Sequence, residues 1–444
     1  MKHASAIAFI ISLMLPLQSG SAGERQESER QPSPMTLKDC LLYAREHAHG
    51  NRISRLEAGA ASAEKRISAA DMMPYISFGS SGSLSFGRNI DPETNTYDNK
   101  KTLGTGFGLE MSLPLFDGLV RINTLKALQA AELRKKKAQL VEEDRISLEV
   151  IKGFYNISYC TAMVNQMRSQ LTRDSTDLAA AGRELTLGTK SGADVAELEA
   201  IVAADRYELI NQQNLLKKAD LALRSAMGMP VSGMPLLIAE EPEEKPVSES
   251  VRILPEIEEA ELAVREGRMY LRAAKGGYSP RISFNAGVST SFYRMVGTEA
   301  EFPSFARQFR DNMGEYLGLS FSFPIFDGLS TRNRVRKAAI QLRENEERLE
   351  QTRYRLDQAT EEARLDHEAA TEELSAAQSR LSAERLAYKA MRRRYELGAA
   401  SAIELYTSSS KLAQAEANLT GKRIQKIISE ITLRYYEGHP LISN

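Results

Sequence analysis

The feature that most restricts the fold of this chain is an internal duplication. Residues 74–88 (PYISFGSSGSLSFGR) match residues 280–294 (PRISFNAGVSTSFYR), an offset of 206 residues. Residues 108–119 (GLEMSLPLFDGL) match residues 318–329 (GLSFSFPIFDGL) at an offset of 210 residues. A third pair, LGTKSGAD and LGAASAIE, keeps that offset further along the chain. Because the blocks keep their order, we expect two copies of one structural unit.

Each copy contains two runs in which apolar residues alternate with small or polar ones. The apolar positions are Ile76, Phe78, Leu84, Phe86, Leu103, Phe107, Leu109, Met111 and Leu113, and then Ile282, Phe284, Val288, Phe292, Leu317, Leu319, Phe321 and Phe323. Side chains alternate between faces along a strand, so each run predicts a strand with one apolar face. The runs are about 10 to 13 residues long, which fits a tilted strand that crosses a bilayer. A soluble β-sandwich is the alternative, but it does not explain the helices described below.

Membrane strands impose a condition on assembly, because every backbone N–H and C=O inside lipid needs a partner. Four strands cannot close a barrel, since the smallest common membrane barrels have about eight. We therefore expect the chain to share a barrel with copies of itself. Two copies would give about eight strands and three copies about twelve, and backbone pairing alone does not distinguish these two numbers.

Long helical sequence follows each pair of strands. It runs without proline from about Val120 to Leu187 and from about Thr331 to Leu397. Each run would form a helix roughly 100 Å long. Apolar residues recur every seven positions in the second run, which predicts a coiled coil; they are Val335, Leu342, Leu349, Leu356, Ala363, Ala370, Ala377 and Met391. Each run ends at a glycine that a potential N-cap serine follows, which predicts helical hairpins returning along 192–228 and 402–437.

These patterns predict the organisation of the whole chain. Residues 1–22 read as a signal peptide with a positive start, an apolar core and a small-residue cleavage site. The other predicted segments are a first repeat over 23–228 (strand pair 75–115, hairpin 119–228), a Pro-rich acidic linker over 229–250, a second repeat over 251–437 (strand pair 281–325, hairpin 330–437) and a tail over 438–444. Segments 36–70 and 251–275 are expected to be helices that lead into the strands.

Composition and motifs argue against several other classes of protein. The 58 basic and 59 acidic residues balance, whereas a nucleic-acid binder normally has a basic surface. Phosphate-loop, Gly-x-Ser-x-Gly and His-Glu-x-x-His motifs are absent, so we expect neither an enzyme nor a cofactor. His47 and His49 lack an evident third ligand, so no metal site is expected. Cys40 and Cys160 are interpreted as small buried residues rather than a disulfide or a metal pair.

The doubled halves, the strand exits and the helical tips together resemble the TolC family of outer-membrane efflux proteins, over nearly the whole mature chain. The strand exits read Pro-x-Phe-Asp-Gly, with Pro114, Phe116, Asp117 and Gly118 in the first copy and Pro324, Phe326, Asp327 and Gly328 in the second. The resemblance implies a mixed α and transmembrane β fold. It implies a homotrimer with a twelve-stranded barrel in the outer membrane, continued by a helical barrel in the periplasm. It further implies export of small molecules or proteins through a tripartite efflux or type I secretion system, with a periplasmic adaptor and an inner-membrane pump as partners.

The same resemblance implies roles for residues at the two tips. Asp194, Glu404 and Tyr395 correspond to a periplasmic gate, and the adaptor-contact positions are Leu187, Gly188, Ser191, Leu397, Gly398 and Ser401. The alternative is that the two acids are first-turn residues favoured by the helix dipole, and that the glycines are ordinary C-caps. Two family positions differ, because a locking arginine is Ala400 here and a second acid is Thr407. Our hypothesis is that Lys190 compensates.

Two rival functions fit parts of the pattern. A trimeric coiled-coil surface adhesin would gather its strands at the C-terminus, which the duplication disfavours. A periplasmic coiled-coil adaptor would not need four strands of bilayer length. Within the favoured class, the sequence does not distinguish drug, metal and protein cargo.

Overall fold

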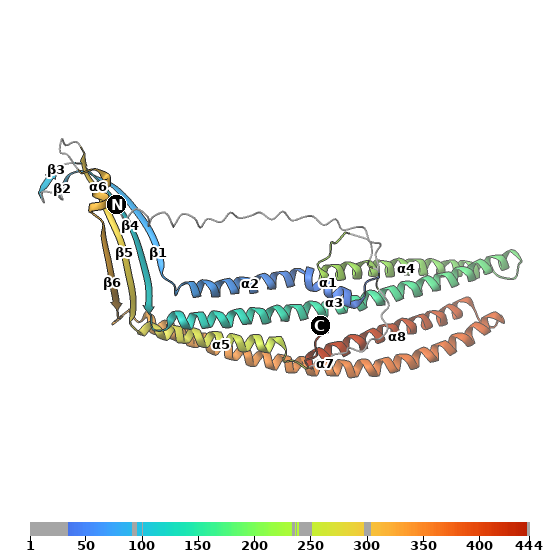
Figure 1. The fold of residues 1–444 in the computed structure, drawn as a ribbon. Helices are drawn as coiled ribbons and strands as arrows, with labels where there is room; N and C mark the ends of the chain where they lie inside the picture. The colour runs from blue at the N-terminus through green and yellow to red at the C-terminus, as the bar shows by residue number, and fades with distance from the viewer. Residues whose placement is uncertain are drawn as a thin grey trace.

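The protein is elongated, with a sheet at one end and two helical hairpins at the other, as Figure 1 shows for the computed structural model. The structure describes residues 34–90, 96–99, 101–232, 236, 238, 251–296 and 303–441. The predicted signal peptide, most of the predicted linker and parts of both strand-connecting loops lie outside these ranges.

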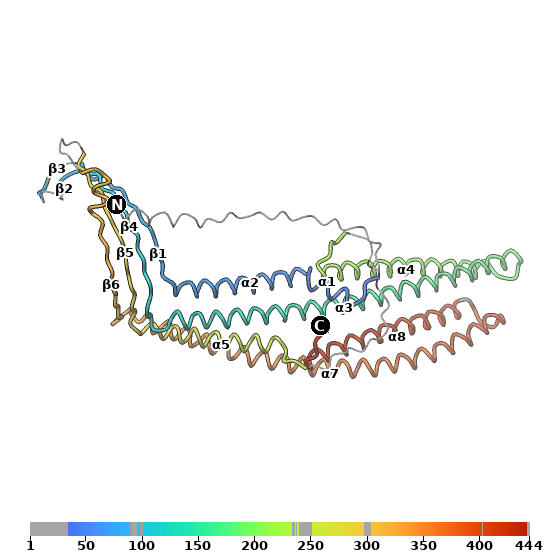
Figure 2. Tube along the Cα trace, viewed as in Figure 1, coloured from blue at the N-terminus to red at the C-terminus, as the bar shows by residue number. Residues whose placement is uncertain are grey.

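Helices make up most of the length. The first copy contains α1 (Leu37–His47), α2 (His49–Ala70), α3 (Val120–Thr186) and α4 (Gly192–Met227), and the second contains α5 (Pro255–Lys275), the 3-10 turn η1 (Gly276–Tyr278), α6 (Phe305–Asp311), α7 (Ser330–Glu396) and α8 (Ala402–Tyr436). Helices α3 and α7 have 67 residues each, which confirms the predicted length of the outgoing helices. Helix α3 packs against α4 and α7 packs against α8, while α5 lies between α3 and α7 (Figure 2).

The helix expected over 36–70 is interrupted, so that prediction was wrong in one detail. Ala48 separates α1 from α2 with an extended backbone (φ −58°, ψ 132°). The end of α4 lies against this point, because a Cβ added to Gly228 would come within 2.6 Å of the His47 carbonyl oxygen. The Ala44 carbonyl oxygen accepts hydrogen bonds from the Ala48 backbone N–H (2.9 Å) and from the Asn51 side chain (3.1 Å), so Asn51 of α2 links the two helices across the break.

The main sheet is antiparallel in the order β1-β4-β5-β6. Its strands are β1 (Tyr75–Ser85), β4 (Lys101–Phe116), β5 (Arg281–Val296) and β6 (Gly314–Ser322), and β2 (Arg88–Ile90) pairs separately with β3 (Tyr97–Asn99). Paired residues point to the same face, and Phe78, Leu109 and Val288 lie side by side. The predicted alternation is therefore confirmed, with one apolar face and one face of mostly small polar residues. Strands β1 and β6 form the two edges of this sheet.

The two strand exits have different surroundings, although their sequences match. Strand β4 continues to Phe116, which pairs with Ile282 of β5, whereas β6 ends at Ser322, before the predicted boundary at 325. The inner strand β4 has neighbours on both sides, whereas within the described part of the chain β6 has one only on its β5 side. Phe116 is 38% exposed, but its counterpart Phe326 is 81% exposed.

Each exit turns sharply into a long helix through two consecutive left-handed residues. Gly118 and Leu119 have φ of 72° and 64°, and Gly328 and Leu329 have φ of 65° and 66°. A left-handed leucine costs roughly 1–2 kcal/mol. The aspartate of the motif offsets this cost by capping the helix. Asp327 Oδ2 accepts hydrogen bonds from the backbone N–H (2.8 Å) and the hydroxyl (2.6 Å) of Thr331.

The heptad positions of α7 face its neighbours as predicted. Leu356, Ala363, Ala370 and Ala377 are buried, and the earlier members of the stripe are half-buried. The first part of α7 lies along α5 and the later part along α8, where Ala377 packs with Leu419. Within the described ranges, no helix has an apolar stretch long enough to cross a membrane.

The main hydrophobic core lies where α1, α3 and α4 meet. Cys40 and Cys160 are both buried there and unbridged, as expected of small core residues. Phe154 is the largest of the fully buried side chains.

We predict that Phe154→Ala lowers the free energy of unfolding by about 3–5 kcal/mol, because the vacated space cannot close fully. Phe154→Leu should lower it by much less. Chemical unfolding in detergent, followed by circular dichroism, measures both values. Equal effects of the two substitutions would contradict the assignment of this core.

Candidate functional site

The first helical tip is a tight turn between α3 and α4. Leu187 is the C-cap of α3, and Gly188 follows in the left-handed region (φ 76°). The backbone N–H of Thr189 donates to the Glu184 carbonyl oxygen (3.0 Å), which closes the turn. Nothing lies within 4 Å of a Cβ added to Gly188, so the outer side of the turn is open.

The second tip repeats this geometry between α7 and α8. Gly398 has φ of 69°, and the Ala399 N–H donates to the Arg394 carbonyl oxygen (2.8 Å). At each tip an apolar side chain faces solvent, since Leu187 is 77% exposed and Leu397 is 74% exposed. The predicted adaptor-contact positions thus form two similar exposed turns.

The two predicted gate acids have structural contacts in this conformation. Asp194 Oδ2 accepts hydrogen bonds from the backbone N–H (3.3 Å) and hydroxyl (2.8 Å) of Ser191. Glu404 Oε2 accepts the equivalent pair from Ser401, at 2.8 and 3.1 Å. Both acids therefore complete capping boxes at the starts of α4 and α8. The hydrogen bonds from Ser401 lower the pKa of Glu404, so this carboxylate is ionised at neutral pH.

A contact between Lys190 and Tyr395 connects the two hairpins near their tips. The Lys190 ammonium donates a hydrogen bond to the Tyr395 hydroxyl (2.6 Å) and lies 4.9 Å from the centre of the ring. It also lies 3.3 Å from Glu184 Oε2. Burial alone would lower the pKa of Lys190, but the hydrogen bonds with Tyr395 and Glu184 raise it overall. Of the three predicted gate residues, only Tyr395 takes part in this connection.

An apolar cluster supports the contact from within the hairpins. Ala181, Leu198 and Ile201 form its buried centre, and Tyr395 and Tyr406 from the second hairpin pack against it. The two hairpins thus meet through side chains from α3, α4, α7 and α8.

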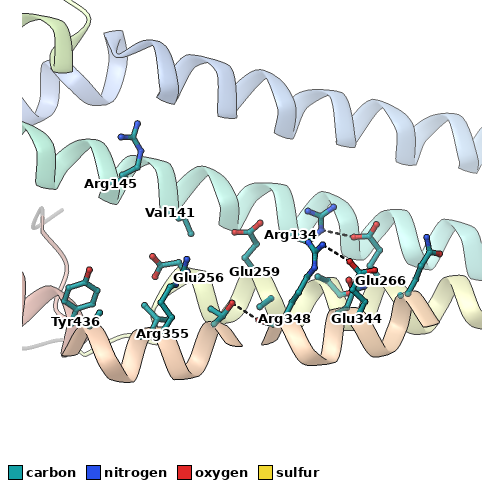
Figure 3. A pocket seen from close by; sticks show the side chains of 18 of the residues that line it. Arg134, Val141, Arg145, Glu256, Glu259, Glu266, Glu344, Arg348, Arg355 and Tyr436 are labelled. Atoms are coloured by element: carbon teal, nitrogen blue, oxygen red, sulfur yellow. Dashed lines mark hydrogen bonds and ion pairs between the residues drawn. The ribbon is translucent and has the colours of Figure 1, made fainter. Parts of the chain in front are cut away.

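A concave region with a volume of about 940 Å³ lies away from the tips, between α3, α5 and α7 (Figure 3). Its walls carry charges of both signs. Arg134 Nε lies 2.8 Å from Glu266 Oε2 and Arg348 Nη2 lies 2.7 Å from Glu344 Oε1, so part of the lining is already paired. Among the described residues, no group of three or more His, Cys, Asp or Glu side chains could hold a metal ion.

Sequence reasoning missed a buried polar group inside the first hairpin. Gln170 and Asp174 of α3 face Asp205 of α4, and the Gln170 amide donates a hydrogen bond to Asp205 (3.3 Å). The symmetry of a helical hairpin could have predicted that Asp174 and Asp205 face each other. Residues at equal distances from the turn face each other, as Asp174 and Asp205 do.

Comparison with known sequences identifies the family. The family described as "Outer membrane efflux protein" matches residues 46–229 and 252–439, and the chain belongs to it. The toluene efflux pump outer membrane protein TtgC of Pseudomonas putida is 23% identical over 394 residues, which cover 86% of this chain and 78% of TtgC. The cation efflux system protein CusC of Escherichia coli is 22% identical over 390 residues, covering 86% of this chain and 82% of CusC.

Solved structures show the same fold. A crystal structure of CusC superposes with a TM-score of 0.78 at 20% identity, covering 92% of this chain and 93% of that one. The CmeC outer membrane channel of Campylobacter jejuni gives 0.77 at 12% identity, covering 96% and 92%. The resemblance to the TolC family is thus confirmed. The protein is an outer-membrane efflux channel with a periplasmic helical part, and the adhesin alternative is not supported.

We predict that Ser401→Ala lowers the free energy of unfolding by about 1 kcal/mol, because the cap of α8 is lost. Hydrogen exchange should become faster in the first turn of α8. Ser410→Ala is the matched control, since Ser410 is exposed on the same helix. If both variants exchange alike, the capping box does not stabilise the tip.

Proposed function

We propose that the protein acts as a homotrimeric conduit whose barrel crosses the outer membrane and whose helical tips receive cargo from a periplasmic adaptor and an inner-membrane pump. The observation that carries this proposal is the open sheet. Its apolar face suits lipid, yet β1 and β6 each present one edge without a partner strand among the described residues. Each backbone group left unpaired in lipid costs several kcal/mol. Other copies of the chain supply the missing strands, and three copies give about twelve strands with room for a lumen.

The second strand exit supports a neighbouring copy at the β6 edge. In the first copy, a Cβ added to Gly118 would clash with the Gly276 carbonyl oxygen, so the turn packs closely against the second copy. Nothing lies within 4 Å of the equivalent position at Gly328. Because the two turns have the same conformation, the surface beside Gly328 is suited to the corresponding part of another chain.

The duplication also predicts the register between chains. Within the chain, Glu110 of β4 lies opposite Gly287 of β5. At the offsets of 210 and 206 residues, the equivalent positions are Ser320 of β6 and Ser81 of β1. We therefore expect Ser320 of one copy to face Ser81 of the next.

Cysteines at these two positions test both the assembly and the register. The double variant Ser320→Cys with Ser81→Cys should form covalent oligomers up to a trimer on oxidation, because facing Cα atoms lie about 4.4–6.8 Å apart in disulfides. The control pairs Ser320→Cys with Ser85→Cys, which is displaced by roughly 13 Å along the strand. Failure of the first pair to cross-link in membranes, or equal cross-linking of both, would contradict this interface.

We assign the tips to adaptor contact and gating. The exposed Leu187 and Leu397 offer apolar side chains, and the adjacent glycines allow close approach of a partner helix. In a trimer, three copies of Asp194 and Glu404 gather around one axis, where like charges repel each other and attract cations. The capping boxes fix these carboxylates at the helix starts.

The Lys190–Tyr395 contact is proposed as a lock on the closed state, in the place of the arginine that is Ala400 here. Lys190→Met should raise single-channel conductance in planar bilayers, because it removes the charge but keeps the apolar length. Tyr395→Phe should raise it less, since the ring still attracts the ammonium. Lys389→Met on the exposed side of α7 is the control. Unchanged conductance in Lys190→Met would rule out the lock.

Cargo selection is assigned to the pump rather than to this chain. The relatives with this fold include one named for toluene efflux and another for cation efflux, so one architecture serves different cargoes. The adaptor and the pump would also supply the energy for transport.

A further inference from the structure

The buried polar group between α3 and α4 suggests a binding site that the channel function does not require. Asp205 is 4% exposed and Gln170 is 3% exposed, so both are buried in the first hairpin. Oδ2 of Asp205, Oδ2 of Asp174 and Oε1 of Gln170 are shielded from solvent and have no hydrogen-bond partner among the described residues. A buried polar atom without a partner normally costs about 1–3 kcal/mol, so the two carboxylate oxygens need an explanation.

The geometry indicates what is missing. Gln170 and Asp174 lie one turn apart on the same face of α3, opposite Asp205 of α4. The carboxyl of Asp174 lies within hydrogen-bonding reach of the carboxyl of Asp205. Two carboxylates at that distance both accept and neither donates, so they repel unless one positive charge lies between them.

We propose that Asp174 and Asp205 bind one proton between them, and that this shared proton holds α3 and α4 together near the tip. One carboxyl then donates to the other carboxylate, as in the carboxyl pairs of acid proteases. The Gln170 amide donates a hydrogen bond to the carboxyl of Asp205 and orients it.

The charges around the pair favour proton binding. Burial raises the pKa of Asp205 most, and the Asp174 carboxyl raises it further, to about 7, while Arg173 of α3 opposes the shift. Tyr406 of α8 packs at the same place, and burial and then the two acids raise its pKa. Burial and then the Asp174 carboxyl raise the pKa of Asp177, the next acid on α3, while Arg392, Lys190 and Arg173 oppose that shift. Arg173 is therefore the nearby cation whose effect on Asp205 is resolved, and it does not cancel the burial.

The site has a consequence for the second hairpin. Tyr406 belongs to the cluster through which the two hairpins meet, next to the Lys190–Tyr395 contact. Loss of the proton leaves two negative charges in the first hairpin, close enough to Tyr406 to act on its hydroxyl. The shared proton is a property in addition to the proposed conduit function. It would make the opening of the helical tips depend on the pH of the periplasm.

The pH dependence has a definite sign. Asp205 in the unfolded chain has a pKa of about 3.9, below its folded value, so the folded state binds more protons between about pH 4 and about pH 7. The free energy of unfolding should fall as pH rises through that window. Asp205→Asn should remove this contribution, because its amide donates to Asp174 at every pH.

The test is a titration of the full-length protein in detergent, followed by infrared difference spectroscopy of protonated carboxyl groups and by proton uptake. We expect wild type to bind about one proton per chain more than Asp205→Asn at about pH 5–6, with a matching carboxyl band. Asp174→Asn serves as a second variant that should lose the same band. Glu199→Gln, an exposed acid on α4, should keep it.

Two results would overturn the proposal. One is that the wild-type titration shows no infrared carboxyl band that disappears in both Asp205→Asn and Asp174→Asn. The other is a band that appears only after chelation of Mg²⁺ and Ca²⁺, because a divalent cation would then occupy the pair. The oligomeric state is measured on the same samples, so failure of the trimer and failure of the proton site are distinguishable.

Discussion

The architecture depends on the need to pair backbone groups along the two open edges of one antiparallel sheet. The sheet has an apolar face, and its outermost strands β1 and β6 each lack one neighbour within the described chain. In water such edges can be hydrated, but in lipid they cannot. This difference turns an incomplete sheet into part of a larger barrel. Because the two halves of the chain are duplicated, the pairing of β4 with β5 inside one chain predicts how β6 of one chain pairs with β1 of the next.

The long helices α3 and α7 leave the sheet directly after strands β4 and β6. At both exits, an Asp-Gly-Leu sequence follows the strand and leads directly into a long helix, and the aspartate caps that helix. The strained leucine conformation occurs in both copies, which indicates that the angle between strand and helix matters to the fold. Helices of 67 residues then carry the tips roughly 100 Å from the sheet.

The repeat, the strands, the long helices and the tips could all be predicted from sequence because each has a local signal. Period two marks the strands, a heptad marks α7, and glycine followed by serine marks the tips. The break at Ala48 was not predictable, because it depends on the approach of Gly228 from the far end of α4. Strand β6 ends at Ser322, before the predicted boundary, and among the described residues it has a neighbouring strand only on its β5 side.

The candidate site was predictable to a smaller extent. The tip residues were found by resemblance, yet the partner of Tyr395 is Lys190, which only a hypothesis had named. Asp194 and Glu404 complete capping boxes, as expected of acids in the first turn of a helix, and their gate role stays a proposal. The Asp174–Asp205 pair carries no motif, because it exists only once two helices are folded against each other. Burial of polar groups depends on tertiary contacts that a single sequence does not display.

The most direct test of this account is native mass spectrometry of the protein released from detergent micelles. The account predicts one dominant species with three copies of the chain, and no stable single chain in detergent-free buffer. A water-soluble monomer that keeps its sheet would contradict it, because its edges would then need no partner.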